Sequence, residues 1–131
     1  MSRSDYQINE FVFASPSLFV LTTNLGHLYT LRLPDFSEGP TIKALTSVTY
    51  TADASPRGRY IAVGCADATT TVWDMDQFLG YKTISSFEYC SFFIYQINCV
   101  FSSPARSVGF SYDGQFIASG LEDGSIDIVS F

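Results

Sequence analysis

Charged side chains are scarce in this sequence, and basic side chains are the scarcest. Asp, Glu, Lys and Arg make up 15% of the 131 residues, and seven Lys and Arg stand against thirteen Asp and Glu, for a net charge of -6. The basic residues are scattered along the chain. Proteins that bind nucleic acid directly concentrate Lys and Arg on one face. We therefore expect contact with nucleic acid only indirectly, through other protein subunits.

Long apolar runs are also missing. The most apolar stretch, 89–101, is interrupted by Ser91, Gln96 and Asn98 and is shorter than the ~18 residues that a transmembrane helix needs. The first residues, Met1–Asp5, are not followed by the apolar segment of a secretory signal. These features predict an intracellular protein without a membrane segment.

Residues that could perform catalysis or bind a metal lie in no recognisable motif. The only histidine, His27, has no Ser or Cys nucleophile motif near it, which favours a structural role. The three cysteines, Cys65, Cys90 and Cys99, form no Cys-x-x-Cys pair. An odd number of such cysteines predicts a protein of a reducing compartment.

Several acidic residues resemble reactive sites only superficially. Asp74 and Asp76 could form an acid–base pair or a metal site, but Asp residues at the ends of turns usually cap loops. The run Glu122-Asp123-Gly124 lacks the remaining ligand spacing of a calcium loop. We therefore predict no enzyme, no catalytic residues, no cofactor, no metal and no small-molecule substrate.

Apolar and aromatic residues, by contrast, are abundant. They make up 47% and 16% of the chain, which excludes a disordered tail, and the length suits one domain. The stretch 55–74, SPRGRYIAVGCADATTTVWD, alternates turn residues with short β-forming runs. It predicts a turn at 55–58, a strand at 60–64, an Asp-bearing hairpin at 66–68 and a strand that ends on Trp73-Asp74.

The same pattern returns later in the chain. A turn at 111–114, a strand at 116–120, a hairpin at 122–124 and a strand at 125–129 follow in the same order. The Gly, Gly and Asp landmarks of the two copies share one offset of 56 residues, which chance rarely produces. The residues that define the repeated motif are Gly58, Gly64, Asp67, Trp73, Asp74, Gly114, Ser119, Gly120 and Asp123.

This succession of turn, apolar strand, Asp-bearing hairpin and strand closing on Trp-Asp resembles one WD repeat, the unit of a β-propeller. The resemblance implies an all-β fold, a propeller fragment of about three four-stranded antiparallel blades that does not form a closed ring. We expect a flexible N-terminus at 1–10 and repeats at about 11–46, 47–87 and 104–131. Trp73 is expected to lie against a neighbouring blade.

The first repeat is degenerate, since it has turns and strands without the Asp and Trp landmarks. Proline and glycine clusters separate its short apolar runs. Its predicted elements are strands at 11–13, 18–21 and 27–33, a polar connector at 34–40 and an outer strand at 41–45.

The segment Cys90–Ser103 interrupts the regular spacing after an expected outer strand at 82–86. It carries no charge and contains two of the three cysteines. Without its fourteen residues the offset between repeats falls from 56 to 42, within the ~40–45 residues of WD repeats. Three interpretations are open: an exposed partner-binding loop, part of an irregular outer strand, or an intron read in frame. The sequence favours the third.

A narrower resemblance rests on Gly64–Ala68, Val72–Asp76, Arg106–Gly114 and Ala118–Asp123, and on the ending Ile126-Asp127-Ile128. These stretches are similar to the WD-repeat subunit family of the THO complex. The resemblance implies a nuclear, non-enzymatic scaffold with other subunits of a THO/TREX-type complex as partners, in transcription-coupled mRNA processing and nuclear mRNA export. Another WD-repeat adaptor, in trafficking or ubiquitin-ligase assembly, is the alternative, and a propeller enzyme is a remote one.

The sequence departs from the family in one respect and offers one candidate contact site. Many WD repeats bury a hydrogen-bonded set of His, hydroxyl, Asp and Trp, but Val63 stands at the hydroxyl position and Leu45 near the His position. We therefore expect the hairpin Asp to bond N–H groups of its own turn. Arg57 and Arg59 lie in a loop of the kind that contacts partners, although a solvated turn explains them as well.

Overall fold

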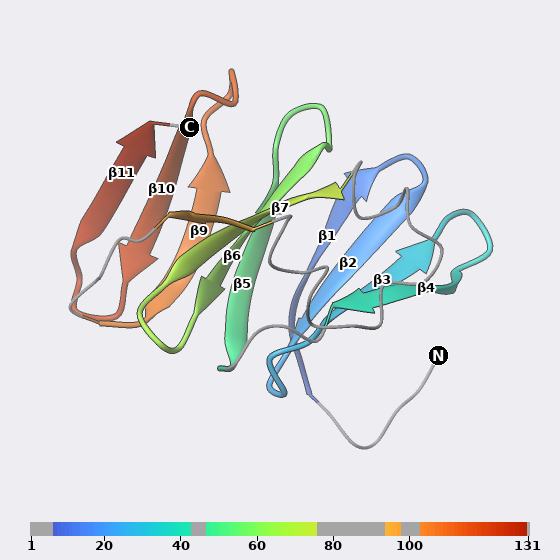
Figure 1. The fold of residues 1–131 in the computed structure, drawn as a ribbon, viewed down its shortest axis with the longest axis horizontal. Coiled ribbons are helices and arrows are strands. Elements are labelled where there is room, and N and C mark those ends of the chain that lie inside the picture. The colour runs from blue at the N-terminus through green and yellow to red at the C-terminus, as the bar shows by residue number, and fades with distance from the viewer. Residues whose placement is uncertain (1–6, 43–46, 76–93, 98–102, 131) are drawn as a thin grey trace.

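Three antiparallel β-sheets lie side by side in the computed structural model of the chain (Figure 1). The structure describes residues 7–42, 47–75, 94–97 and 103–130. We call the sheets blades 1, 2 and 3. Blade 1 contains β1 (Ile8–Ser15), β2 (Leu18–Thr23), β3 (Leu28–Arg32) and β4 (Ser37–Ile42). Blade 2 contains β5 (Thr49–Ala54), β6 (Tyr60–Cys65), β7 (Thr70–Asp74) and β8 (Ile94–Ile97), and blade 3 contains β9 (Ala105–Phe110), β10 (Phe116–Leu121) and β11 (Ile126–Ser130).

This architecture confirms the predicted fold class. Each blade is a meander whose strands pair with their neighbours in chain order, and every element with described bounds is a strand. The three blades stack in one direction and do not close into a ring (Figure 1). No helix in the described part of the chain is long and apolar enough to cross a membrane.

The strand registers show that the three blades are built alike. The pairing of the second strand with the third is the same in each blade, with blades 1 and 2 offset by 42 residues and blades 2 and 3 by 56. The corresponding pairs are Phe19 with Leu31, Ile61 with Trp73, and Ile117 with Val129. The fourteen extra residues therefore fall between equivalent positions of blades 2 and 3.

The hairpin between the second and third strands requires one residue in the left-handed region. Gly26, Ala68 and Gly124 occupy this position, with φ of 77°, 67° and 89°, and the same two offsets relate them. Glycine adopts this conformation without strain, whereas the Cβ of alanine is crowded there. Ala68 is thus the strained member of the set.

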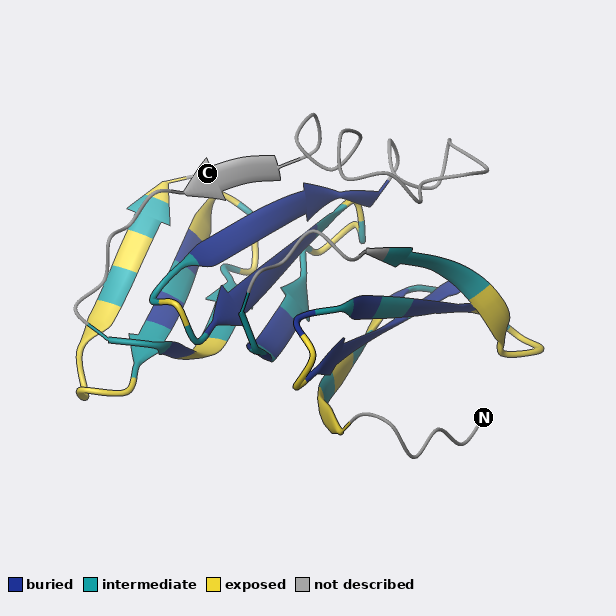
Figure 2. Ribbon diagram, turned by 60° about the horizontal axis from the view of Figure 1, so that its bottom comes forward, coloured by how far each residue is buried: buried dark blue, intermediate teal, exposed yellow. Residues whose placement is uncertain are grey.

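Apolar side chains fill both spaces between the blades, and the strands β6 and β7 of the middle blade are almost wholly buried (Figure 2). One cluster joins blades 1 and 2, and a second joins blades 2 and 3. The first contains Ala14, Leu18, Val20, Leu28, Ala52, Ile61, Val63, Cys65, Trp73 and Met75, and the second contains Ala62, Val72 and Ile117 with Tyr60, Val108, Phe110 and Val129 packed against it. The expectation that Trp73 lies against a neighbouring blade agrees with its place in the first cluster.

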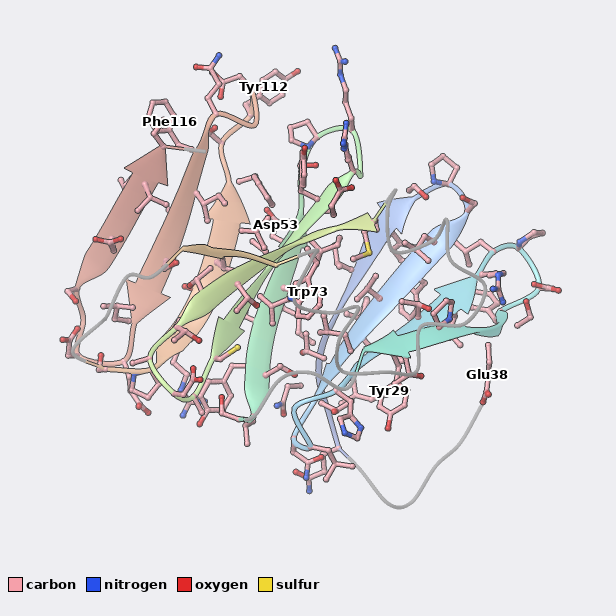
Figure 3. All side chains as sticks on the ribbon, in the orientation of Figure 1. Tyr29, Glu38, Asp53, Trp73, Tyr112 and Phe116 are labelled. Atoms are coloured by element: carbon pink, nitrogen blue, oxygen red, sulfur yellow. The ribbon has the colours of Figure 1, made fainter. Side chains whose placement is uncertain are left out.

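Carboxylates also connect the innermost strands of successive blades. Glu10 on β1 accepts a hydrogen bond from the Ala52 N–H on β5 at 3.0 Å, and Asp53 on β5 accepts one from the Phe110 N–H on β9 at 2.8 Å. Figure 3 shows Asp53 between the second and third blades. Because a backbone N–H at this position has no strand partner on that side, each carboxylate satisfies a group that would otherwise be unpaired.

The predicted boundary of the N-terminus is wrong by three residues. Residues up to 10 were expected to be flexible, whereas β1 begins at Ile8, which pairs with Thr23, and Glu10 pairs with Thr22. The reason is tertiary: the Glu10 carboxylate reaches blade 2, an interaction that local composition does not reveal.

The outer strand of blade 1 also lies earlier than predicted. β4 covers much of the expected connector 34–40, and residues 43–45 of the expected strand lie outside the described residues. The Asp35 carboxylate accepts bonds from the N–H and hydroxyl of Ser37 at 3.2 and 3.0 Å, and these bonds turn the chain immediately after β3. Pro40 is compatible with this strand because an outer strand leaves one side of its backbone unpaired.

The outer strand of blade 2 comes from the irregular segment 90–103. β8 pairs with β7 from Thr70 opposite Ile97 to Trp73 opposite Ile94. The expected outer strand at 82–86 lies outside the described residues. Among the three interpretations of this segment, the pairing of β8 supports the one in which it contributes an outer strand.

Candidate functional site: adjoining turns of blades 2 and 3

The turn between β5 and β6 is fixed by its own first residue. The Ser55 carbonyl accepts the Gly58 N–H at 2.8 Å, and the Ser55 hydroxyl accepts the Tyr60 N–H at 3.1 Å. Gly58 has φ of 73°, and a Cβ there would overlap the Ala14 carbonyl oxygen of blade 1. The turn is therefore fixed by its own hydrogen bonds and packs closely against blade 1.

The turn between β9 and β10 repeats this geometry one blade further on. The Ser111 carbonyl accepts the Gly114 N–H at 2.9 Å and the Ser111 hydroxyl accepts the Phe116 N–H at 3.0 Å. Asp113 accepts bonds from the Ser111 hydroxyl and the Gln115 N–H at 2.7 and 3.1 Å, and these bonds lower the pKa of its carboxyl. The two turns are thus equivalent in structure and adjacent in space.

The two arginines singled out in the sequence have different environments. The Arg59 guanidinium donates to the Asp74 carboxylate, with Nη2 to Oδ2 at 3.2 Å and Nε to Oδ1 at 3.4 Å, and its centre lies 5.2 Å from the centroid of the Tyr60 ring. The Asp74 side chain is 1% exposed, so Arg59 neutralises a buried charge. Arg57 is exposed on the turn and is the better candidate for a partner contact.

Two neighbouring hollows lie between these turns. One, of about 340 Å³, is lined by Ser55, Pro56, Arg57, Arg59, Tyr60, Asp113 and Gly114. The other, of about 480 Å³, is lined by Ala54, Pro56, Phe110, Ser111 and Tyr112. Because Pro56 lines both, the two hollows adjoin at the boundary between blades 2 and 3, and we call the pair the turn groove.

Tyr112 stands beside the turn groove with its side chain fully exposed (Figure 3). Tyrosine and arginine are the residues that most often carry the binding energy of protein interfaces. Sequence reasoning identified Arg57 and missed Tyr112, because only the fold brings residues so far apart in the chain to one groove. The aromatic residue inside an otherwise polar turn is the signal that could have indicated it.

The hairpin aspartates of the repeated motif have structural partners. The Asp67 N–H donates to the Ser47 hydroxyl at 3.3 Å, and the Asp123 N–H donates to the Ser103 hydroxyl at 3.1 Å. The Asp67 carboxylate accepts from the Thr69 hydroxyl at 2.5 Å, whereas the Asp123 carboxylate accepts from both the hydroxyl and the N–H of Ser125, at 2.5 and 2.9 Å. The expected bond to a turn N–H is thus present at Asp123, while the bond at Asp67 comes from a hydroxyl.

The remaining motif residues lie in contacts within and between blades. The Trp73 Nε1–H donates to the Thr71 hydroxyl at 3.0 Å in buried surroundings. The Ser119 and Thr70 hydroxyls are 2.8 Å apart across the boundary of blades 2 and 3. A Cβ at Gly64 would lie 2.9 Å from the Ala105 carbonyl oxygen of blade 3, so this position requires glycine for the close approach of two blades.

At Gly120 glycine is required by a contact within blade 3, and not by the approach of another blade. A Cβ there would overlap the Ser107 hydroxyl on the paired strand β9. Gly114, in the turn, has φ of 75° and lies beside Pro56 of blade 2. Both glycines therefore belong to the framework of blade 3.

The residues considered for catalysis or metal binding are dispersed. The His27 ring nitrogen Nδ1 lies 3.1 Å from the Tyr29 hydroxyl. Burial raises the pKa of the Cys65 thiol to about 12, with the nearby Asp67 carboxylate adding to the effect. Asp76, Cys90 and Cys99 lie outside the described residues. Among the residues that the structure describes, no three His, Cys, Asp or Glu side chains gather to hold a metal ion.

Comparison with known proteins defines the family. Residues 39–74 and 94–128, together more than half of the chain, match the WD40 family model, described as WD domain, G-beta repeat. The chain belongs to the WD-repeat family. Each matched region begins in or at the outer strand of one blade and ends in the third strand of the next, so the WD repeats and the blades are offset by one strand.

Two proteins of known family are similar to this chain over most of its length. THO complex subunit 3 of Arabidopsis thaliana is 34% identical over 129 residues, which cover 98% of this chain and 36% of that protein. WD repeat-containing protein AAC3 of Dictyostelium discoideum is 33% identical over 92 residues, 70% of this chain and 14% of that protein. The WD-repeat chain thus spans about a third of the first relative and less of the second.

The solved structure confirms the fold alone. The crystal structure of the computationally designed Ika4 protein aligns with 95% of this chain and 66% of its own length, with a TM-score of 0.71 and 15% identity. At that identity the agreement concerns the stacked blades and carries no information about partners.

Proposed function

We propose that this chain is a non-enzymatic protein-interaction scaffold that acts in a nuclear THO/TREX-type complex, in transcription-coupled mRNA processing and mRNA export. The observation that carries the proposal is the 34% identity to THO complex subunit 3 across 98% of the chain. WD repeats at two places support the scaffold role, since blades of this kind present rigid turns on which contact residues are displayed.

The turn groove is the surface on which we expect a partner subunit to bind. Arg57 and Tyr112 are exposed at its rim, and the serine-capped turns hold its walls in place. A rigid groove loses little conformational entropy on binding, which favours affinity. The partner is another protein subunit, and any RNA would be reached through the complex.

Affinity purification of the full chain from nuclear extract, followed by mass spectrometry, tests this proposal. THO subunits in the eluate are the expected result, and Arg57→Glu with Tyr112→Ala should reduce their recovery at least tenfold. Leu25→Ala, at an exposed apolar residue on a turn of blade 1, is the matched control and should leave recovery unchanged. An eluate of trafficking or ubiquitin-ligase components without THO subunits would instead identify a different WD-repeat adaptor.

A further inference from the structure

The two outermost faces of the blade stack carry large apolar side chains. Phe11 and Phe13 on blade 1, and Phe116, Ile126 and Ile128 on blade 3, are between 46% and 71% exposed. Figure 2 shows β11 as alternating exposed and half-buried residues, in contrast to the buried strands β6 and β7 of the middle blade. Apolar side chains gathered in this way mark an interaction surface.

The interface between blades 2 and 3 identifies what such a surface binds. We define the leading face of a blade as the side toward the preceding blade and the trailing face as the side toward the next. The trailing face of blade 2 supplies Tyr60, Ala62 and Val72, and the leading face of blade 3 supplies Val108, Phe110, Ile117 and Val129.

The exposed face of blade 3 is a trailing face of the same design. The offset of 56 residues relates the three residues of blade 2 to three residues of blade 3. Ala118 on β10 pairs with Ile128 on β11, as Ala62 pairs with Val72 in blade 2. The corresponding residues are Tyr60 and Phe116, Ala62 and Ala118, and Val72 and Ile128. The positions that bury a blade interface in the middle of the stack are therefore exposed at its end.

The exposed face of blade 1 is likewise a leading face. Phe13 pairs with Phe19 as Phe110 pairs with Ile117. Leu31, a buried residue of the same face, corresponds to Val129 through the two offsets. The centroid of the Phe19 ring lies 5.5 Å from that of Phe11 and 4.8 Å from that of Phe13. Blade 1 thus presents an aromatic version of the surface that blade 3 packs onto blade 2.

We propose that a second copy of this chain covers both faces, with blade 3 of each copy packed against blade 1 of the other. Each new interface would place a leading face on a trailing face, as between blades 2 and 3. Two copies would supply six blades, within the four to eight that close a propeller. Head-to-tail contacts of this kind form a closed ring when the rotation that relates one copy to the next returns to the first copy.

One further feature of blade 3 favours this arrangement. Gly109 stands where blade 2 has Asp53, whose carboxylate bonds the next blade. The trailing face of blade 3 is therefore smaller and less polar at this point than that of blade 2. Bulky aromatic residues on β1 of a second copy would pack more favourably at this position than at one that carries a carboxylate.

The molar mass of the full chain in solution, measured by light scattering or sedimentation equilibrium, tests the proposal. We expect twice the chain mass of 14.5 kDa at micromolar concentration. Phe13→Asp on the leading face and Ile128→Arg on the trailing face should each halve the mass. Leu25→Arg, at an exposed residue of a blade 1 turn, is the control and should leave it unchanged.

An equimolar mixture of Phe13→Asp and Ile128→Arg is the decisive sample. Each variant keeps the face that the other lacks, so the mixture should regain the double mass through one intact interface. A parent chain of single mass would overturn the proposal, as would a Phe13→Asp variant that stays dimeric, because the latter would show that blade 3 pairs with itself. Phe11→Lys and Ile126→Lys form a second pair of variants if either of the first unfolds.

Discussion

At the residue scale, the motif that identifies the family works through packing and turn geometry. Trp73 is buried in the cluster between blades 1 and 2, whereas the Asp67 side chain is exposed at the tip of a hairpin. Although both residues belong to one repeated pattern, their environments differ greatly. Their contributions to stability should therefore differ as well.

We predict that Trp73→Ala lowers the free energy of unfolding by about 3–5 kcal/mol, because it leaves a cavity between two blades. Asp67→Ala should cost at most about 1 kcal/mol, since its bond to Thr69 is exposed to water. Denaturant titration monitored by circular dichroism measures both values. Equal losses for the two variants would contradict the burial that the structure assigns to them.

Ala68 offers a test of the backbone conformation itself. Its φ of 67° lies in the left-handed region, so Ala68→Gly should raise the free energy of unfolding by about 0.5–1 kcal/mol. The matched variant Gly124→Ala places an alanine at the equivalent hairpin of blade 3, where a Cβ meets no atom within 4 Å. It should destabilise by a similar amount through backbone strain alone. A destabilising Ala68→Gly would mean that the hairpin adopts another turn.

Residue roles were predictable where the cause is local. The turns at Gly58 and Gly114 follow from serine and glycine a few positions apart, and the structure contains both. The pairing of Arg59 with Asp74 was not predictable, because it joins a turn residue to the end of a strand that follows later in the chain. Tyr112 escaped notice for the same reason, since its neighbours come from another blade.

At the element scale, the main difference between prediction and structure concerns the outer strands. The inner strand β6 carries a short, continuous apolar run because both of its faces are covered, and such a run between turn residues predicts a strand well. Outer strands contact less of the core and have weaker patterns. Thus most of β4 falls in the stretch 34–40 that was predicted to be a connector, and β8 falls in a segment that the sequence suggested to be an intron.

The position of β8 yields a prediction opposite to that of the intron interpretation. Because β8 pairs with β7, whose residues are all buried, deletion of 90–103 should expose the edge of β7 and lower the unfolding midpoint. An intron read in frame would add no structure, so its removal would raise the midpoint. Chemical denaturation of the deleted and parent chains distinguishes the two outcomes.

Proline substitutions provide a finer test of the same strand. Successive N–H groups point to opposite sides of a strand, so only one of Tyr95 and Gln96 donates to β7. One of Tyr95→Pro and Gln96→Pro should therefore cost about 1–3 kcal/mol more than the other. If neither substitution changed stability, β8 would not be part of the sheet.

At the scale of the whole molecule, the three blades form an open stack whose ends resemble its interior. The strands β6 and β7 of the middle blade are covered on both faces, but the leading face of blade 1 exposes Phe11 and Phe13, and the trailing face of blade 3 exposes Phe116, Ile126 and Ile128. A domain is stabilised by only about 5–15 kcal/mol in total, so apolar area left in water on two faces is a large cost. The open stack was predicted from the number of repeats in the sequence. The correspondence between the exposed faces and the buried interface of blades 2 and 3 could be recognised only from the strand registers of the structure.

The concentration dependence of unfolding tests most directly the claim that the blade faces require a partner. If folding is coupled to association of two chains, each tenfold increase in protein concentration should stabilise the dimer by about 1.4 kcal/mol and raise its denaturant midpoint. We predict such a rise for the full chain, and its loss in Ile128→Arg. A sharp, cooperative transition whose midpoint stays the same over a hundredfold range of concentration would contradict the account.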